Sequence, residues 1–329
     1  MKILLTGASG FLGYRTLEKL ILLPDVQEII ATARTLLDYR TIKHQKVTYK
    51  IGDLENDDFV NKITTGVDII INTASLSSPW GKRQDFVIAN LKTQENLIRA
   101  AKKNQISRFI YISSPSIYYT GKSRMNVKED DKLPQKFVNE YARTKYEAEI
   151  LLKNSGIPYV SLRPRALIGR GDSIIMPRLI KAFDQGRLKI IGDGKNLVDL
   201  TSVSNVADAI ILSIFSNSNS INQAYNITNG EPVNLWDNID FVLNELNKKL
   251  IKKKIPFFIV DSIAAIMELK SIVTNQKEPT LTRYGVGTLA KSFTLDISKA
   301  NLFLNYHPKM NTRDGILEFI NWYRMHEKN

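Results

Sequence analysis

Short apolar runs alternate with segments of helical periodicity through the first half of the chain. Residues 2–6 and 28–33 are apolar runs of strand length, and residues 11–21 between them carry apolar positions at helical spacing. The alternation continues to about residue 162. Because alternating strands and helices build parallel sheets with helices on both faces, the pattern predicts an α/β fold with a doubly wound parallel sheet.

The second half of the chain has a different pattern, in which helices predominate. Helical patterns mixed with short strands cover residues 175–185, 234–250 and 257–272. We therefore expect two domains. The sheet domain comprises residues 1–168, with residues 199–228 returning to it. A smaller, mostly helical C-terminal domain, here called the cap, comprises residues 169–198 and 229–329.

A glycine-rich turn joins the first predicted strand to the first predicted helix. Gly7, Gly10 and Gly13 allow a tight turn and close approach of the backbone to a pyrophosphate. The helix that follows supplies N–H donors, including those of Phe11 and Leu12, and a positive dipole end. Because the glycines stand between a strand and a helix, they predict a Rossmann-type dinucleotide site.

The end of the second strand bears on which dinucleotide is bound. This strand ends at Thr32-Ala33-Arg34, without the acidic residue that usually contacts the ribose of NAD. Arg34 would accommodate a 2′-phosphate, so NADP(H) is favoured over NAD(H); alternatively, Arg34 is only a solvated loop charge. Asp53 is expected to accept a hydrogen bond from the adenine amino group. Further residues expected to line the cofactor cleft are Leu54, Thr73 and Ala74.

Tyr141 and Lys145 are spaced for proton chemistry next to this cofactor. A spacing of four places both side chains on one helix face, so the ammonium of Lys145 is expected to lower the pKa of the Tyr141 phenol. A general acid works best when its pKa is brought toward the operating pH. The same spacing occurs at residues 39 and 43 and at residues 118 and 122, so the dinucleotide turn carries the interpretation.

These features together resemble the extended short-chain dehydrogenase/reductase superfamily over almost the whole chain. The matching segments are residues 6–13, 52–54, 112–118 and 162–165, Gly169 and the Tyr141/Lys145 pair. The resemblance implies that residues 1–168 bind NAD(P) and that the cap binds substrate. It implies a catalytic set of Ser114, Tyr141 and Lys145, with Ser114 on the substrate oxygen. It also implies that Tyr141, Lys145 and Pro164 contact the cofactor.

Further segments are similar to the 3β-hydroxysteroid dehydrogenase-like branch, which includes bacterial reductases of 2-alkyl-3-keto acids. These segments are residues 78–81, 192–201 and 230–237. The resemblance implies an NAD(P)-dependent oxidoreductase that interconverts a ketone and a secondary alcohol on a small hydrophobic substrate. That substrate is steroid-like or a long-chain β-keto or β-hydroxy acid. Candidate substrate contacts are Trp80, Ser116 and Arg165.

Two other functions are weighed against this one. In a nucleotide-sugar epimerase or reductase of the same superfamily, an arginine usually holds the pyrophosphate where this chain has Val198. Sugar-nucleotide dehydratases carry an Asp-Glu pair where this chain has Pro115 and Ser116. A non-catalytic NADP-binding scaffold or sensor usually loses the catalytic tyrosine or lysine, and this chain keeps both.

The composition of the chain limits which ligands and partners we expect and where in the cell the protein is expected to work. The chain of 329 residues has no cysteine, and its three histidines are scattered, so we expect neither disulfides nor a metal centre. The net charge of +13 comes from dispersed basic residues, so we expect no nucleic-acid partner. Residues 1–5 are too short for a signal-peptide core, and no run is long enough for a membrane span, so we expect a cytoplasmic protein. A homodimer is compatible with the sequence.

One segment of the cap suggests contact with a membrane. Five of the seven residues from 248 to 254 are lysines, and an apolar segment from 255 to 267 follows directly. At helical spacing its large side chains fall largely on one face: Phe258, Ile259, Ile263, Ile266 and Met267. This face either packs on the core of the cap or forms a greasy substrate entrance at an anionic membrane surface.

Overall fold

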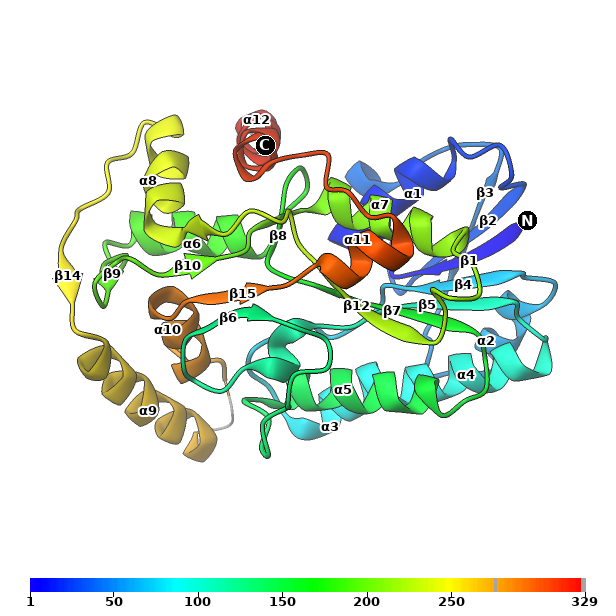
Figure 1. Ribbon diagram of the computed structural model, residues 1–329, viewed down its shortest axis with the longest axis horizontal. Coiled ribbons are helices and arrows are strands. Elements are labelled where there is room, and N and C mark those ends of the chain that lie inside the picture. The colour runs from blue at the N-terminus through cyan, green and yellow to red at the C-terminus, as the bar shows by residue number, and fades with distance from the viewer. Residues whose placement is uncertain (275–276, 327–329) are drawn as a thin grey trace.

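The computed structural model of the chain describes residues 1–274 and 277–326 (Figure 1). A seven-stranded parallel sheet lies at its centre, in the order β12-β7-β5-β4-β1-β2-β3. Its strands are β1 (Lys2–Thr6), β2 (Glu28–Ala33), β3 (Val47–Ile51), β4 (Ile69–Asn72), β5 (Arg108–Ile112), β7 (Tyr159–Pro164) and β12 (Gln223–Ile227). The predicted parallel sheet is confirmed, and the predicted strand 28–33 has the predicted bounds.

Helices cover both faces of this sheet (Figure 1). One face packs against α1 (Phe11–Leu20), α7 (Val203–Ile214) and α11 (Ser298–Leu304), and the other against α2 (Asp57–Thr64), α4 (Thr93–Lys103) and α5 (Glu140–Lys153). Each helix turns its apolar stripe to the sheet. In α1, for example, Leu17 and Leu20 are fully buried against the strands. The doubly wound architecture predicted from the alternating pattern is therefore confirmed.

The strand order reverses between β1 and β4, and this reversal positions the site. From β1 the chain moves outward to β2 and β3 in one direction, whereas β4, β5, β7 and β12 follow in the other. The carboxyl ends of β1 and β4 are joined where the Thr6 hydroxyl donates a 2.6 Å hydrogen bond to Asn72 Oδ1. Ligands of such sheets bind in the crevice outside the carboxyl ends at this reversal.

The remaining elements form smaller sheets and a group of helices beside the large sheet. A four-stranded sheet runs β13 (Val233–Asn234), β10 (Leu197–Val198), β15 (Phe293–Leu295), β6 (Arg124–Val127). Two-stranded sheets pair β8 (Leu167–Ile168) with β11 (Thr201–Ser202), and β9 (Ile190–Ile191) with β14 (Lys254–Ile255). The further helices are α3 (Arg83–Phe86), α6 (Ile175–Asp184), α8 (Leu235–Glu245), α9 (Phe257–Val273), α10 (Arg283–Ala290) and α12 (Thr312–His326).

The predicted cap helices are confirmed, with one bound corrected. Helices predicted at 175–185 and 257–272 correspond to α6 and α9, but the helix predicted at 234–250 ends at Glu245. Asn247 adopts a left-handed backbone with φ +59°, and the N–H of Lys248 turns back to donate to the Leu243 carbonyl. This arrangement caps and ends the helix.

Candidate active site

The turn between β1 and α1 has no room for side chains. Gly7 has φ +68°, and the N–H of Gly10 donates to its carbonyl over 2.8 Å. A Cβ on Gly13 would lie 2.1 Å from that same carbonyl oxygen. Only glycine therefore permits this close packing of helix on turn, which leaves the helix N-terminus open toward a ligand.

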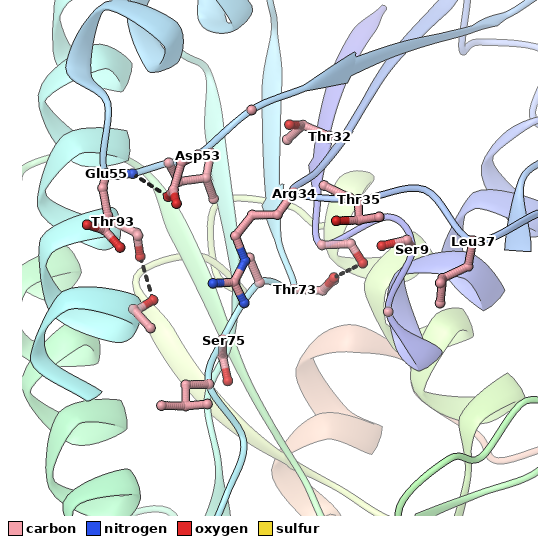
Figure 2. A pocket seen from close by; sticks show the side chains of 18 residues that line it. Ser9, Thr32, Arg34, Thr35, Leu37, Asp53, Glu55, Thr73, Ser75 and Thr93 are labelled. Atoms are coloured by element: carbon pink, nitrogen blue, oxygen red, sulfur yellow. Dashed lines mark hydrogen bonds between the residues drawn. The ribbon is translucent and has the colours of Figure 1, made fainter. Parts of the chain in front are cut away.

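A cavity of about 370 Å³ opens beside this turn, over the carboxyl ends of the strands (Figure 2). Its wall includes several residues predicted to bind the cofactor: Gly7, Gly10, Arg34, Asp53, Leu54, Thr73 and Ala74. Phe11, Leu12 and Gly13 lie in the first turn of α1, and Pro164 ends β7. The bare glycine turn and the polar residues of the wall fit a dinucleotide.

Arg34 contributes a cation to this cavity. Its side chain extends from the end of β2 into the middle of the cavity, between Asp53 and Thr73 (Figure 2). Within residues 1–274 and 277–326, Arg34 makes no hydrogen bond or ion pair. Since a guanidinium without a partner is free to pair with a phosphate, its position is compatible with recognition of a 2′-phosphate.

The three candidate catalytic residues come from two neighbouring elements. Ser114 follows β5, and its Oγ accepts a 3.2 Å hydrogen bond from the N–H of Ser116, at the start of a 3₁₀ turn (Pro115–Tyr118). Tyr141 and Lys145 lie on α5, whose N-terminus is capped by Asn139 through a 2.9 Å hydrogen bond from the N–H of Ala142. Capping fixes the first turn of α5, which holds Tyr141 beside the end of β5.

Tyr141 is partly buried, and its hydroxyl faces two serines. Burial raises the pKa of Tyr141 above its usual value of 10.0, and hydrogen bonds with Ser114 and Ser77 offset only part of that rise. The expectation that Lys145 lowers this pKa is wrong for this structure. The lowering influences come from the two serine hydroxyls, whereas the ammonium of Lys145 is turned toward other groups.

Lys145 lies beneath Tyr141, with almost no exposure to solvent. Its ammonium donates a hydrogen bond to the Ile112 carbonyl and lies 4.3 Å from the centre of the Tyr111 ring. Burial lowers the pKa of Lys145 to about 7, although Glu149, one turn further along α5, acts in the opposite direction. The lysine is therefore poised to change its charge near neutral pH.

Several residues of this site were not identified from the sequence. Asn90 lies in a turn of π-helix (Val87–Lys92), accepts 2.8 Å from the N–H of Leu76 and donates 3.0 Å to the Thr144 hydroxyl. It thereby ties the loop that holds Ser77 to α5. A buried ion pair between Glu149 and Arg163 lies beneath Lys145. Nothing in the spacing of Asn90 predicts a π-turn, which is frequent at functional sites.

A second cavity of about 740 Å³ adjoins the first through the loop that follows β4. Residues 73–76 of this loop line the smaller cavity, and residues 79–81 line the larger one. Ser77, a partner of Tyr141, lies between the two groups. The hydroxyl of Tyr141 therefore contacts the loop that lines both cavities, and Glu140, which precedes Tyr141, lines the larger one. Aromatic side chains of the larger wall are Trp80, Phe86, Tyr119, Phe137, Phe257 and Tyr284.

The candidate substrate contacts differ in their positions. Trp80 lines the larger cavity, whereas Ser116 is buried, with its Oγ 2.9 Å from that of Ser114. Arg165 stacks over the Phe293 ring at 4.8 Å, and its charge lowers the pKa of Tyr119, whose pKa burial raises to about 12. Among residues with described positions, no group of three or more His, Asp or Glu side chains is arranged to hold a metal ion.

Comparison with known proteins adds a family and relatives. The model of the 3-beta hydroxysteroid dehydrogenase/isomerase family matches residues 4–257. The uncharacterized protein YbjS of Escherichia coli K12 is 32% identical over 338 residues, covering 100% of this chain and 99% of that protein. The 2-alkyl-3-oxoalkanoate reductase of Stenotrophomonas maltophilia K279a is 30% identical, covering 96% of this chain and 97% of its own. The Bordetella bronchiseptica enzyme WbmH, solved with NAD+, has a TM-score of 0.78 at 18% identity, with 99% of each chain covered, which is a likeness of fold alone.

Proposed function

The chain belongs to the 3-beta hydroxysteroid dehydrogenase/isomerase family of nicotinamide-dependent oxidoreductases that act on hydroxyl and oxo groups, and from this we propose that it reduces the ketone of a hydrophobic 3-oxo acid to a secondary alcohol with NADPH. The observation that carries the proposal is the Tyr141 hydroxyl, which hydrogen-bonds with Ser114 and with Ser77 of the loop that lines both cavities, and which has Lys145 one turn further along α5.

The three candidate catalytic residues then have distinct roles. The bound cofactor supplies a hydride to the carbonyl carbon. Tyr141 donates its phenolic proton to the carbonyl oxygen, and its raised pKa keeps that proton in place before reaction. Ser114 donates a hydrogen bond to the same oxygen and stabilises the charge that develops there. Lys145 would bind the nicotinamide ribose from beneath Tyr141.

The cofactor-binding residues follow from the smaller cavity. Gly7, Gly10 and Gly13 with the N–H groups of Phe11 and Leu12 would hold the pyrophosphate, and Asp53 the adenine. Further contacts would come from Leu54, Thr73, Ala74 and Pro164. The preference for NADPH over NADH rests on Arg34, a cation in the cavity with no partner in the described ranges 1–274 and 277–326.

The division of labour between domains is also a proposal. Residues 1–168 and 199–228 would bind the cofactor, and residues 169–198 with 229–329 would bind substrate. Pairing of β12 with β7 and packing of α7 against α1 support the return of residues 199–228 to the first domain. The larger cavity supports the second assignment, because α9 and α10 supply part of its wall.

Arg165 favours a substrate with a carboxylate group near the reacting carbonyl. Its guanidinium is half-buried, its Nε is buried without a partner, and it forms no ion pair with any residue of known position in the structure. It lies close enough to Tyr119, in the wall of the larger cavity, to affect its pKa. The Asp199 carboxyl is near enough for the charge of Arg165 to lower its pKa, but it makes no ion pair with the guanidinium, which is therefore still open to a carboxylate of a ligand. A 3-oxo acid supplies that anion, whereas a neutral steroid ketone does not.

The alternative within the superfamily, a nucleotide-sugar epimerase or reductase, is less well supported. The position where such enzymes usually hold the pyrophosphate is occupied by Val198, which is buried in β10 between β13 and β15. An apolar side chain there supplies no charge for a diphosphate. A non-catalytic scaffold would have no use for the Tyr141, Ser114 and Lys145 arrangement.

A substrate screen with one pair of variants tests the proposal. NADPH oxidation would be measured with a long-chain 3-oxo acid, its methyl ester, a steroid ketone and UDP-sugars. Arg165→Met should lower kcat/KM for the free acid about 10- to 100-fold, since a charge-assisted contact is worth about 1.5–3 kcal/mol, with little change for the ester. Arg283→Met is the control, because Arg283 lines the larger cavity but is already paired with Asp261.

The outcomes separate the candidate functions. Activity on the free acid that depends on Arg165 supports the proposal. Equal activity on acid and ester, unaffected by Arg165→Met, would contradict the role of the carboxylate. Interconversion of UDP-sugars would favour the epimerase, and no turnover of any class with intact NADPH binding would favour a scaffold.

A further inference from the structure

Helix α9 carries a broad apolar surface that is exposed to solvent. Five of its large apolar side chains are more than half exposed: Phe258, Ile266, Leu269, Ile272 and Val273. Ile259 and Ile263 are exposed as well. Figure 1 shows α9 at the edge of the molecule, far from the large sheet. Clusters of exposed apolar side chains on this scale mark a binding surface in folded proteins.

This surface is not the core of the cap. Val260 and Ala264 are the α9 side chains that join the buried cluster of the cap, together with residues such as Trp236 and Leu243. Of the two accounts drawn from the sequence, the one in which the apolar face packs inward is therefore wrong. The inward face of α9 is narrow, and most of the large apolar side chains of the helix lie outside that face and are exposed to solvent.

The acidic and basic residues near α9 differ in whether they have partners. The two acidic residues of α9, Asp261 and Glu268, are both engaged by Arg283 of α10, through an ion pair of 2.9 Å and a backbone hydrogen bond of 2.8 Å. The segment that leads into α9 carries exposed lysines instead. The ammonium groups of Lys249, Lys253 and Lys254 make no ion pair within the described chain.

We propose that α9 and the lysines before it dock the protein on an anionic lipid bilayer. The helix would lie in the plane of the interface, with its exposed apolar face among the acyl chains and Lys249, Lys253 and Lys254 at the head groups. Phe257 and Ile272 of the same helix also line the larger cavity, so that cavity would open at the lipid surface. The docking concerns where the protein works, and it holds whichever ketone is reduced.

A bilayer suits this surface better than a second copy of the chain. A symmetric dimer through α9 would bring two lysine segments together at one interface, in a protein that already carries a net charge of +13. An anionic bilayer instead attracts the lysines and buries the apolar side chains together. Docking must be interfacial, because no helix in the described ranges is long and apolar enough to cross a membrane.

Vesicle sedimentation with matched variants tests the apolar contribution. The full chain would be mixed with vesicles of phosphatidylcholine alone or of equal phosphatidylcholine and phosphatidylglycerol. We expect binding only to the anionic vesicles. Phe258→Ser, Ile266→Ser and Val273→Ser together should weaken binding about a hundredfold or more, since each loses a buried apolar side chain. The control replaces equally exposed apolar residues elsewhere: Leu22→Ser, Leu302→Ser and Met325→Ser.

A second pair of variants tests the charge contribution. Lys249→Gln, Lys253→Gln and Lys254→Gln together should weaken binding, by about fivefold for each lysine. The control removes three exposed lysines of the sheet domain, Lys102, Lys103 and Lys153, and so makes the same change in net charge. Raising the salt concentration to about 1 M should have a similar effect on the unmodified protein.

Sedimentation of the protein without vesicles identifies the competing occupant. If the protein binds no vesicles and forms a dimer that the three α9 serine substitutions dissociate, the surface is an interface between copies and the proposal is overturned. Equal loss of vesicle binding in the α9 variant and in its control would also overturn it. Thermal melting of each variant identifies unfolding, and since all substituted side chains are exposed, the melting temperatures should stay close to that of the parent.

Discussion

Two glycines, one beside each cavity, are both packed too tightly for a Cβ, but against different kinds of neighbour. A Cβ on Gly13, in α1, would lie 2.1 Å from the Gly7 carbonyl oxygen and 2.8 Å from its carbon. A Cβ on Gly287, in α10, would lie 1.7 Å from the hydroxyl of Tyr119. The first neighbour is the backbone of the cofactor turn, which cannot move without loss of the turn. The second is the end of a side chain, which can shift without a change in the backbone.

The two cavities are therefore built in different ways. The smaller cavity is formed by the backbone of a turn and by the ends of parallel strands, and the fold itself sets its shape. The larger cavity is walled by side chains, including those of Trp80, Tyr119 and Tyr284, that come from distant segments. A cavity formed by the backbone suits a cofactor that is the same in all members of a family. A cavity formed by side chains suits a substrate that differs between members, because side chains can be exchanged without a change of fold.

The largest expected effect tests whether the proton donor of the reaction comes only from the sheet domain, which forms the smaller cavity, or also from the cap. Tyr141→Phe keeps the ring but removes the proton donor, so kcat should fall by about 10² to 10⁴, with NADPH affinity nearly unchanged. Steady-state kinetics on the identified substrate and a fluorescence titration with NADPH measure the two quantities.

Tyr284→Phe is the matched control from the cap. Tyr284 is close enough to Tyr141 to raise the pKa of its phenol, but it lies on α10. Its loss should change kcat only a few-fold. Equal losses in the two variants would mean that the cap also supplies proton chemistry, and undiminished turnover in Tyr141→Phe would remove the assignment of Tyr141.

The second effect concerns the buried lysine of the cofactor region. In the folded protein, burial lowers the pKa of Lys145 to about 7, from a usual value of 10.5. Between these pH values the unfolded chain holds more protons, so the free energy of unfolding should rise with pH across this window. The rise from Lys145 should amount to a few kcal/mol, because each tenfold change in proton affinity corresponds to about 1.4 kcal/mol.

Urea unfolding of the unmodified protein and of Lys145→Met, from about pH 6 to about pH 10, measures this effect. The difference in stability between the two proteins should change across the window in favour of the unmodified protein, because its buried ammonium loses its charge there. A difference in stability that stays constant with pH would show that burial does not lower the pKa of Lys145.

The residues of the smaller cavity could be predicted well from the sequence, because the backbone conformation there limits which residue types fit. A larger residue at Gly7 or Gly13 would force the turn to shift, and the strand ends at Arg34, Asp53 and Thr73 follow from strand periodicity. Residues that follow successive strands in one sheet must meet at one edge, so their convergence could be predicted without coordinates.

Side-chain direction and contacts between distant segments could not be predicted. The spacing of Tyr141 and Lys145 gave their shared helix face, but it did not show that the Lys145 ammonium points to Ile112 rather than to the phenol. Asn90 depends on a π-turn that leaves no mark in the sequence. For α9, periodicity gave the apolar face correctly, yet which side met solvent depended on how α10 packs against it.

The third effect uses the two glycines directly. Gly13→Ala should cost about 1–3 kcal/mol of stability through overpacking, and it should weaken cofactor binding because the turn must shift. Gly287→Ala should cost less, since a shift of the Tyr119 side chain relieves the contact, but it should alter KM for substrate by moving that side chain in the larger cavity. Urea midpoints and KM values for both variants separate the two regions; equal losses of stability would contradict the difference drawn between them.

The smallest effect tests whether the first region is wholly set by its backbone or also uses one side chain. Arg34 is the exposed cation in the smaller cavity, and it has no partner among the residues placed by the structure. If it pairs with the 2′-phosphate, that contact is worth at least about 1.5 kcal/mol, so Arg34→Ala should weaken NADPH binding about tenfold or more and leave NADH binding nearly unchanged.

Arg99→Ala is the control, because Arg99 is similarly exposed but lies on α4 and pairs with Asp57. Titration of each variant with both cofactors gives the answer. Equal losses for NADPH and NADH would show that Arg34 supports the cavity without reading the phosphate, and the cofactor preference would then have to come from the backbone as well.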